Sequence, residues 1–295
     1  MRPYQPLIII GAPRSGTNAI RDALTTLSRV GTWPCDELNP LWRYDNWNEL
    51  TDELSAEQMT NRGRRYIRKA FDKLAQRHNL EVVVEKTCAN SLRVPYVASA
   101  LPQARYLYIV RDGRAAAIST MRRWLGTTPV GYLFRKARFV PARAWPTEVA
   151  SVVRSRLPRT PRRGSRVRSW GPRFEGIDRS LSEDPLHILC ARQWTRCVDL
   201  ADEGLSAIPS ERVFSVTYRG FVTTPGLILA KIMEFLELDQ DPTAVDAAVE
   251  RIHRDSLHRW SMELSNDQVR EIEQVAGNTL RRHGFRLKSG CIDSS

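Results

Sequence analysis

Residues 6–18, PLIIIGAPRSGTN, decide the fold. The stretch begins with a short run of apolar, mostly β-branched residues, which is typical of a strand buried in a parallel sheet. A loop bounded by two glycines, Gly11–Gly16, follows the run. Over residues 17–29 the apolar positions then recur with the spacing of one helical face. The chain therefore begins with a strand, a loop and a helix.

The same alternation continues along the chain. Strands alternating with helices imply a parallel sheet with right-handed crossovers, so we expect an α/β fold of three layers, with a central parallel sheet flanked by helices. A charged amphipathic helix or helix pair is predicted over 52–78. The other predicted strands lie at 81–86, 104–110 and 213–216, and the other predicted helices at 91–101, 115–124, 185–201, 225–236, 242–252 and 265–283.

Length and composition indicate one large domain over residues 1–295. The 295 residues, 42% of them hydrophobic, are enough to bury a sizeable core. An insertion or lid is predicted at about 126–184, because Pro, Gly and Arg are frequent there and no period is sustained. The five cysteines are scattered and odd in number, so they encode neither a disulfide framework nor a zinc site. No signal peptide or membrane span is recognisable, and we expect a cytoplasmic protein.

The positive charge is concentrated in one segment. Residues 135–179 contain 13 of the 45 basic residues and 3 of the 33 acidic ones, so this segment carries a net +10 of the total +12. Nucleic acid, an anionic membrane or an acidic substrate would each suit such a cluster. The rest of the chain is nearly neutral.

The loop Gly11–Gly16 has the G-x-x-x-x-G spacing of a phosphate-binding P-loop, with a strand before it and a helix after it. Backbone N–H groups and the positive end of the helix can cradle a phosphate there. Thr17 and Asn18 stand where a nucleotide triphosphatase has Lys and Ser or Thr, which disfavours that class. Arg14 supplies a cation within the loop, where a bound anion would stabilise it. A P-loop-like fold with a different anionic substrate is therefore expected.

A second motif, RDGRA at 111–115 with Ser119 eight residues after Arg111, follows the predicted strand 104–110. Arg111 and Ser119 can both face the carboxyl edge of the sheet, where α/β proteins bind ligands. Guanidinium groups suit bidentate phosphate recognition. Together the two motifs resemble the sulfotransferases that use 3′-phosphoadenosine 5′-phosphosulfate (PAPS), in the bacterial and protein-tyrosine sulfotransferase-like branch.

The resemblance implies a set of PAPS-binding residues and, as product, adenosine 3′,5′-bisphosphate (PAP). In that family the first loop holds the 5′-phosphosulfate, and the Arg and Ser of the second motif hold the 3′-phosphate. Two later segments, 216–225 and 254–260, also resemble the family. In the first, the acid usual after Tyr218 is absent, and in the second, Arg259 replaces a Lys. The implied cofactor-binding residues are Pro13, Arg14, Ser15, Gly16, Thr17, Asn18, Arg111, Ser119, Arg123, Tyr218 and Arg259.

Direct sulfuryl transfer to a hydroxyl requires a base and cations rather than a covalent intermediate or a metal. The resemblance implies Arg14 and Lys86 as the cations and places a base after the first helix, where Glu37 is our prediction and Asp36 the alternative. A carboxylate among apolar neighbours such as Trp33 would have a raised pKa, as a general base requires. The five histidines show no metal-ligand spacing, so no metal site is expected.

The acceptor is left open by the sequence. A small molecule, a glycan, a lipid or a peptide with a hydroxyl group would suit the chemistry, and residues 135–179 are expected to contact an anionic membrane or an acidic substrate. Two alternatives from other classes are an Arg-rich nucleic-acid-binding module, with aromatic residues interleaved in that segment, and a P-loop kinase. We expect no nucleic-acid partner, because the basic segment lacks a recognised nucleic-acid-binding motif.

Overall fold

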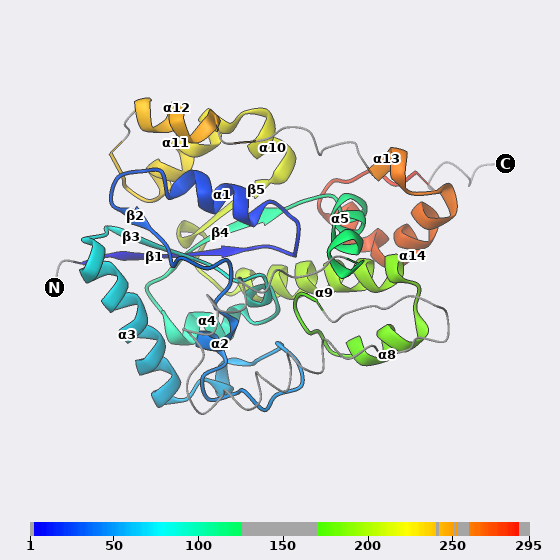
Figure 1. Cartoon of the computed structure of the whole chain (residues 1–295), viewed down its shortest axis with the longest axis horizontal. Helices are drawn as coiled ribbons and strands as arrows, with labels where there is room; N and C mark the ends of the chain where they lie inside the picture. Colours follow the sequence, from blue (N-terminus) through cyan, green and yellow to red (C-terminus); the bar gives the residue numbers. More distant parts are fainter. Residues whose placement is uncertain (1–2, 126–169, 240–241, 251, 253–259, 289–295) are drawn as a thin grey trace.

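The computed structural model describes residues 3–125, 170–239, 242–250, 252 and 260–288. Its centre is a five-stranded sheet with the order β2-β3-β1-β4-β5, in which every pairing is parallel. Helices cover both faces of the sheet (Figure 1), which confirms the expected three-layer α/β fold. The strands are β1 (Gln5–Ile10), β2 (Val30–Gly31), β3 (Val82–Lys86), β4 (Arg105–Val110) and β5 (Val213–Thr217).

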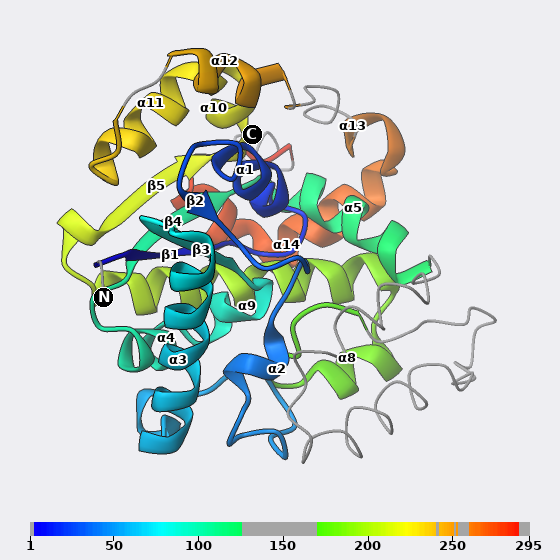
Figure 2. The same ribbon diagram turned by 60° about the vertical axis from the view of Figure 1, so that its left-hand side comes forward.

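The two faces of the sheet follow from the alternation of side chains along each strand. In β1, Leu7 and Ile9 join one apolar cluster, whereas Ile8 and Ile10 join the other. The first cluster is covered by α1 (Thr17–Leu24), α10 (Tyr218–Thr223), α11 (Pro225–Phe235) and α12 (Pro242–Glu250). The second is covered mainly by α3 (Asn61–His78), α4 (Val94–Ala100) and α9 (Leu186–Ser206), and Figure 2 shows both layers from a second direction.

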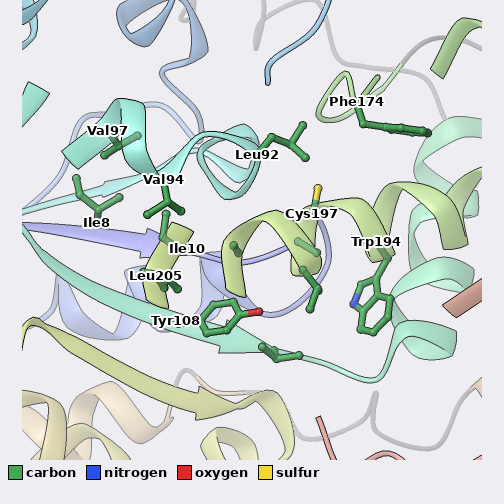
Figure 3. Packing of buried hydrophobic residues seen from close by; sticks show 14 of the residues in the cluster. Ile8, Ile10, Leu92, Val94, Val97, Tyr108, Phe174, Trp194, Cys197 and Leu205 are labelled. Carbon is green, nitrogen blue, oxygen red and sulfur yellow. The ribbon is translucent and has the colours of Figure 1, made fainter. Parts of the chain in front are cut away.

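The long helix α9 supplies much of the second cluster. Its buried side chains Trp194, Cys197 and Leu205 belong to the same apolar cluster as Ile10 and Tyr108 of the sheet, and Figure 3 shows Leu205 beside these two residues. Trp194 also donates from Nε1 to the carbonyl oxygen of Arg111 (3.1 Å). The core on this face therefore contacts the backbone of the predicted second motif directly.

Several predicted helices differ in extent from the observed ones, and the one predicted over 185–201 continues to Ser206. The helix predicted over 17–29 ends at Leu24, and the chain then turns through Arg29, which has a positive φ of 62°, into the unpredicted strand β2. The segment predicted as a helix over 91–101 begins instead as a 3₁₀ turn, Cys88–Leu92, before α4 starts with Pro95 in its first turn. Residues 52–78 contain a 3₁₀ turn, Ala56–Gln58, and then α3.

Most of the predicted insertion, residues 126–169, lies outside the described residues. From Trp170 onward the chain is fixed to the body of the protein: Gln193 Nε2 donates to the carbonyl oxygens of Trp170 (3.1 Å) and Pro172 (2.9 Å). Asp52 and Arg173 exchange two hydrogen bonds, from Asp52 N to Arg173 O (2.7 Å) and from Arg173 N to Asp52 Oδ2 (2.8 Å). The end of the predicted insertion also contains a regular helix, α8 (Ile177–Glu183), which contacts α9.

A buried ion pair joins helix α5 (Gly113–Leu125) to α14 (Asn266–Arg282). The short helix α13 (Trp260–Glu263) comes just before α14 in the chain. Arg114 Nη1 donates to Glu273 Oε1 (2.6 Å), and Arg114 Nη2 donates to Asp112 Oδ2 (2.7 Å). Glu273 Oε1 also accepts from the amide of Lys288 (2.9 Å). Arg114 and Glu273 are both buried, so this pair fixes the helix on which Ser119 and Arg123 stand.

We predict that Glu273→Ala lowers the free energy of unfolding by about 3–5 kcal/mol, because it leaves the Arg114 charge buried without this partner. Urea unfolding followed by circular dichroism measures the change. As a control, Glu183→Ala should alter stability little, because the ion pair of Glu183 with Arg179 is exposed. Equal stability of the two variants would contradict the role of the Arg114–Glu273 pair.

Candidate functional site

The functional residues predicted from the sequence gather where parallel strands end. The register pairs Ile9 of β1 with Lys86 of β3, and Ile10 of β1 with Tyr108 of β4, so these strands finish almost level with one another. β5 continues the edge, because Val110 pairs with Thr217. Segments that follow parallel strands meet at the carboxyl edge of the sheet, the usual ligand site of α/β proteins. The four segments that meet there begin at Gly11, Thr87, Arg111 and Tyr218.

The loop Gly11–Gly16 connects β1 to the first turn of α1. Two of its residues have positive φ, Arg14 at 66° and Gly16 at 97°. Gly16 is the N-cap of α1, and neither a capping side chain nor an acidic first-turn residue satisfies the helix start. The amide groups at this end of α1 are therefore suited to an anion. Pro13, Ser15 and Thr17 are buried in the loop, whereas Arg14, Gly16 and Asn18 are partly accessible.

Ser15 carries a further sign of a ligand. Its Oγ is fully buried and has no hydrogen-bond partner among the residues that the structure describes. Buried hydroxyl groups are normally hydrogen-bonded. A phosphate oxygen held by this loop would give the hydroxyl an acceptor, so the loop fits a phosphate-containing ligand.

Tyr218 closes one side of the loop. A Cβ atom added to Gly16 would overlap the Tyr218 ring, so the close approach of ring and loop requires glycine. The guanidinium carbon of Arg111 lies 4.5 Å from the centre of the same ring, which indicates a cation–π contact. The predicted strand 213–216 ends before Tyr218, which is the first residue of α10, immediately after β5, with Thr217 as N-cap.

The two sequence motifs meet through Arg14. Its Nε donates to Ser119 Oγ on α5 (3.0 Å), and its carbonyl oxygen accepts from Arg111 Nη1 (2.9 Å). Burial and then the neighbouring positive charge of Arg123 lower the pKa of Arg14 from its ordinary value. The site thus gathers cations against their mutual repulsion, an arrangement that a bound polyanion would stabilise.

Lys86 and Glu37 form the other half of the site. Lys86 Nζ lies 3.3 Å from Glu37 Oε1, and the same oxygen accepts from the amide of Cys88 (3.4 Å). The Lys86 side chain is only 3% exposed, whereas that of Glu37 is 27% exposed and can be reached from solvent. Burial, the largest single influence, lowers the Lys86 pKa, but the Glu37 carboxylate and the smaller contributions of Cys88 and Asp36 together outweigh burial, so the net effect is a raised pKa. The geometry therefore presents a protonated amine beside a carboxylate.

Asp36, the alternative base, points elsewhere. Its Oδ1 accepts from Arg21 Nη1 of α1 (3.2 Å), and its side chain is half exposed. Arg21 also binds Asp22 on the same helix. The structure therefore separates two neighbouring acids, one directed at Lys86 and the other at the flank of α1.

Two neighbours of Lys86 were not predicted as part of the site. Thr87 Oγ1 accepts from the amide of Leu38 (2.8 Å), and Cys88 Sγ lies 3.8 Å from Thr17 Oγ1 of the loop. Their position directly after a strand that ends in Lys86 is the signal that could have identified them. The predicted cofactor residue Arg259 lies outside the described part of the chain.

Comparison with known proteins defines the class. A sulfotransferase family model matches residues 6–168, more than half of the chain, and the chain therefore belongs to the sulfotransferase family. Family membership confirms the class of enzyme expected from the sequence, a PAPS-dependent sulfotransferase, over the kinase and nucleic-acid alternatives. No match was found among curated protein sequences.

Solved structures agree on the fold. The sulfotransferase domain from the curacin biosynthetic pathway is 14% identical, with a TM-score of 0.57 over 97% of this chain and 100% of that domain. The sulfotransferase domain of the Synechococcus PCC 7002 olefin synthase is 13% identical, with a TM-score of 0.53 over 94% and 96% of the two chains. Sulfotransferase STF9 from Mycobacterium avium is 13% identical, with a TM-score of 0.51 over 98% and 79%.

Two further features concern the described residues alone. None of their helices is both long and apolar enough to cross a membrane. Within the same residues, no group of three or more His, Cys, Asp or Glu side chains is arranged to hold a metal ion.

We predict that Glu37→Gln lowers the Lys86 pKa, because it removes the main charge that opposes the effect of burial. The titration of Lys86 can be followed by NMR of ¹³C-labelled lysine. Asp36→Asn is the matched control and should shift the titration much less, since Asp36 is a minor influence that faces Arg21. A larger shift in Asp36→Asn than in Glu37→Gln would contradict the observed pairing.

Proposed function

We propose that this protein transfers the sulfuryl group of PAPS to an acceptor hydroxyl in one direct, in-line step, with Glu37 as the general base. The observation that carries the proposal is the position of the Lys86–Glu37 pair at the sheet edge where the phosphate loop begins. Family membership supports the reaction type. The residue roles rest on the geometry around the loop.

The donor would bind through the two joined motifs. The amides and side chains of Pro13, Arg14, Ser15, Gly16, Thr17 and Asn18 would hold the 5′-phosphosulfate, and Arg111 with Ser119 the 3′-phosphate. Support comes from the uncapped start of α1, the buried Ser15 hydroxyl and the cations that converge on Arg14. Tyr218 would lie beside the bound nucleotide, and Arg123 and Arg259 would add positive charge.

The chemical step would use Glu37, Lys86 and Arg14. Glu37 accepts the proton of the acceptor hydroxyl, the hydroxyl oxygen forms a bond to sulfur, and the bond from sulfur to the 5′-phosphate oxygen breaks. PAP leaves with the electron pair of that bond. Lys86 and Arg14 stabilise the charge that develops on the transferring group and the leaving oxygen. No covalent enzyme intermediate is involved.

We predict that Arg111→Ala weakens PAP binding by about 10- to 100-fold, since a charge-assisted contact to phosphate contributes roughly 1.5–3 kcal/mol. Isothermal titration calorimetry with PAP, in the absence of magnesium, measures the change. Arg122→Ala is the control: Arg122 stands on the same helix as Ser119 but pairs with Glu263, and its loss should leave affinity unchanged. Unaltered PAP binding by Arg111→Ala would contradict the assigned phosphate site.

We further predict that Glu37→Gln lowers turnover by at least about 100-fold, the usual contribution of a general base, while PAP affinity stays within about twofold. Transfer from radiolabelled PAPS reports turnover, and calorimetry reports PAP affinity. Asp36→Asn should retain most activity, because Asp36 faces Arg21. Near-normal turnover by Glu37→Gln would exclude this assignment, and a collapse in Asp36→Asn alone would transfer the role to Asp36.

The acceptor remains a class rather than a molecule: a small molecule, a glycan, a lipid or a peptide with a free hydroxyl group. We propose that the basic residues 135–179 recruit an anionic acceptor or membrane surface, as their net charge of +10 suggests. We also propose one sulfotransferase domain over residues 1–295 that acts in the cytoplasm of a bacterium. Incubation with radiolabelled PAPS and a crude cell extract, followed by identification of the labelled product, would define the acceptor.

A further inference from the structure

Glu85 is a buried carboxylate on the opposite face of β3 from Lys86. The strand places Val83 in the cluster under α3, α4 and α9, and Val84 in the cluster under α1, so consecutive side chains alternate between the two layers. Glu85 is 1% exposed. It therefore does not reach the acceptor directly, and the reaction proposed above leaves it without a role.

Both oxygens of Glu85 accept hydrogen bonds from the segment that follows β3. Thr87 Oγ1 donates to Glu85 Oε1 (2.5 Å), and Asn90 Nδ2 donates to Glu85 Oε2 (2.8 Å). Thr87 and Asn90 are themselves fully buried. The carboxylate thus fixes the direction of the Thr87 hydroxyl, whose oxygen is left to accept from another donor.

That other donor is the backbone amide of Leu38, the peptide group directly after Glu37 (2.8 Å to Thr87 Oγ1). Glu37 itself contacts Lys86 Nζ and the amide of Cys88. The segment that ends β3 therefore holds the Glu37 segment at its backbone as well as at its carboxylate. The backbone contact depends on the hydroxyl that Glu85 orients.

A second set of buried contacts reaches the same segment. Arg93 Nε donates to Asn90 Oδ1 (2.9 Å), and Arg93 Nη2 donates to Asn39 Oδ1 (2.5 Å), two residues after Glu37. Asn39 Nδ2 in turn donates to Asp52 Oδ1 (2.9 Å). Buried charged networks of this kind add little net stability compared with apolar packing, and their hydrogen bonds favour one arrangement of the groups that they join.

From these contacts we infer that Thr87 and Glu85 are positioning residues, which hold the Glu37 carboxylate against Lys86 through the amide of Leu38. This inference rests on the proposed role of Glu37. Neither positioning residue would touch the donor or the acceptor. Their loss would therefore misplace the base while the phosphate loop, to which neither side chain is hydrogen-bonded, keeps its ligand.

The direct test compares Thr87→Val, which keeps the shape of the side chain but removes the hydroxyl, with Thr87→Ser, which keeps the hydroxyl. Crystal structures with PAP should show the distance from Lys86 Nζ to Glu37 Oε1 lengthened beyond 4 Å in Thr87→Val and retained in Thr87→Ser. Turnover with radiolabelled PAPS, measured with phenol and with water as acceptors, should fall about tenfold or more in Thr87→Val only, since small misplacements of a catalytic group are costly. PAP affinity should stay within about twofold.

Three results would overturn the inference. They are an unchanged Lys86–Glu37 distance in Thr87→Val, a loss of PAP affinity as large as the loss of turnover, and equal losses in Thr87→Ser and Thr87→Val. The double variant with Glu37→Gln separates the inference from the proposed function. If Thr87 acts through Glu37, then Thr87→Val has little further effect in that background. Normal turnover by Glu37→Gln alone would contradict the proposed role of Glu37 as base. The comparison of the Lys86–Glu37 distance in Thr87→Val and Thr87→Ser would still test the contacts inferred here.

A second pair of variants tests Glu85 even if Thr87→Val fails to fold. Glu85→Gln keeps only one of the two acceptor oxygens, so either the Thr87 hydroxyl or the Asn90 amide loses its acceptor and turnover should fall. Adding Asn90→Asp restores a donor–acceptor pair, keeps an acceptor for Arg93 and should recover most of the loss. Full activity of Glu85→Gln, or no recovery in the double variant, would contradict the role of Glu85.

Discussion

The parallel register of β1 between β3 and β4 is the constraint on which the site depends. It brings the ends of the two neighbouring strands level with the start of the phosphate loop. Lys86 and Arg111 thereby reach opposite sides of one loop, although 25 positions separate them in the sequence. A shift of one residue in either pairing would turn each side chain to the other face of the sheet.

Electrostatics makes the loop favourable for an anionic ligand. Arg14 has a positive φ and donates to Ser119. Burial and then the like charge of nearby Arg123 disfavour the positive charge of Arg14 and lower its pKa. Arg111 donates to the Arg14 carbonyl and stacks on Tyr218. The positive end of α1 adds to this field. The proposed donor site does not depend on the net charge of the whole chain. It consists of a few cations at one edge of the sheet, and the basic residues 135–179 are not part of it.

The sequence could predict the sheet and the main motifs because both are local signals. An apolar run ending in a glycine loop identifies β1, and the spacing of Arg111 and Ser119 predicts a second phosphate-binding segment. What could not be predicted depends on contacts distant in the sequence. The pairing of Glu37 with Lys86, and of Asp36 with Arg21, is set by how residues 32–38 cross the sheet edge. The short helix α10, which begins at Tyr218 and is capped by Thr217, was not predicted.

The central claim is that one edge of this sheet holds both phosphate groups of the donor beside the Lys86–Glu37 pair. A crystal structure of the protein with PAP tests it most directly. The account predicts the 5′-phosphate on the amides of the loop Gly11–Gly16 and the Ser15 hydroxyl, and the 3′-phosphate between Arg111 and Ser119. PAP bound away from this loop, or with its 3′-phosphate remote from Arg111, would contradict the account.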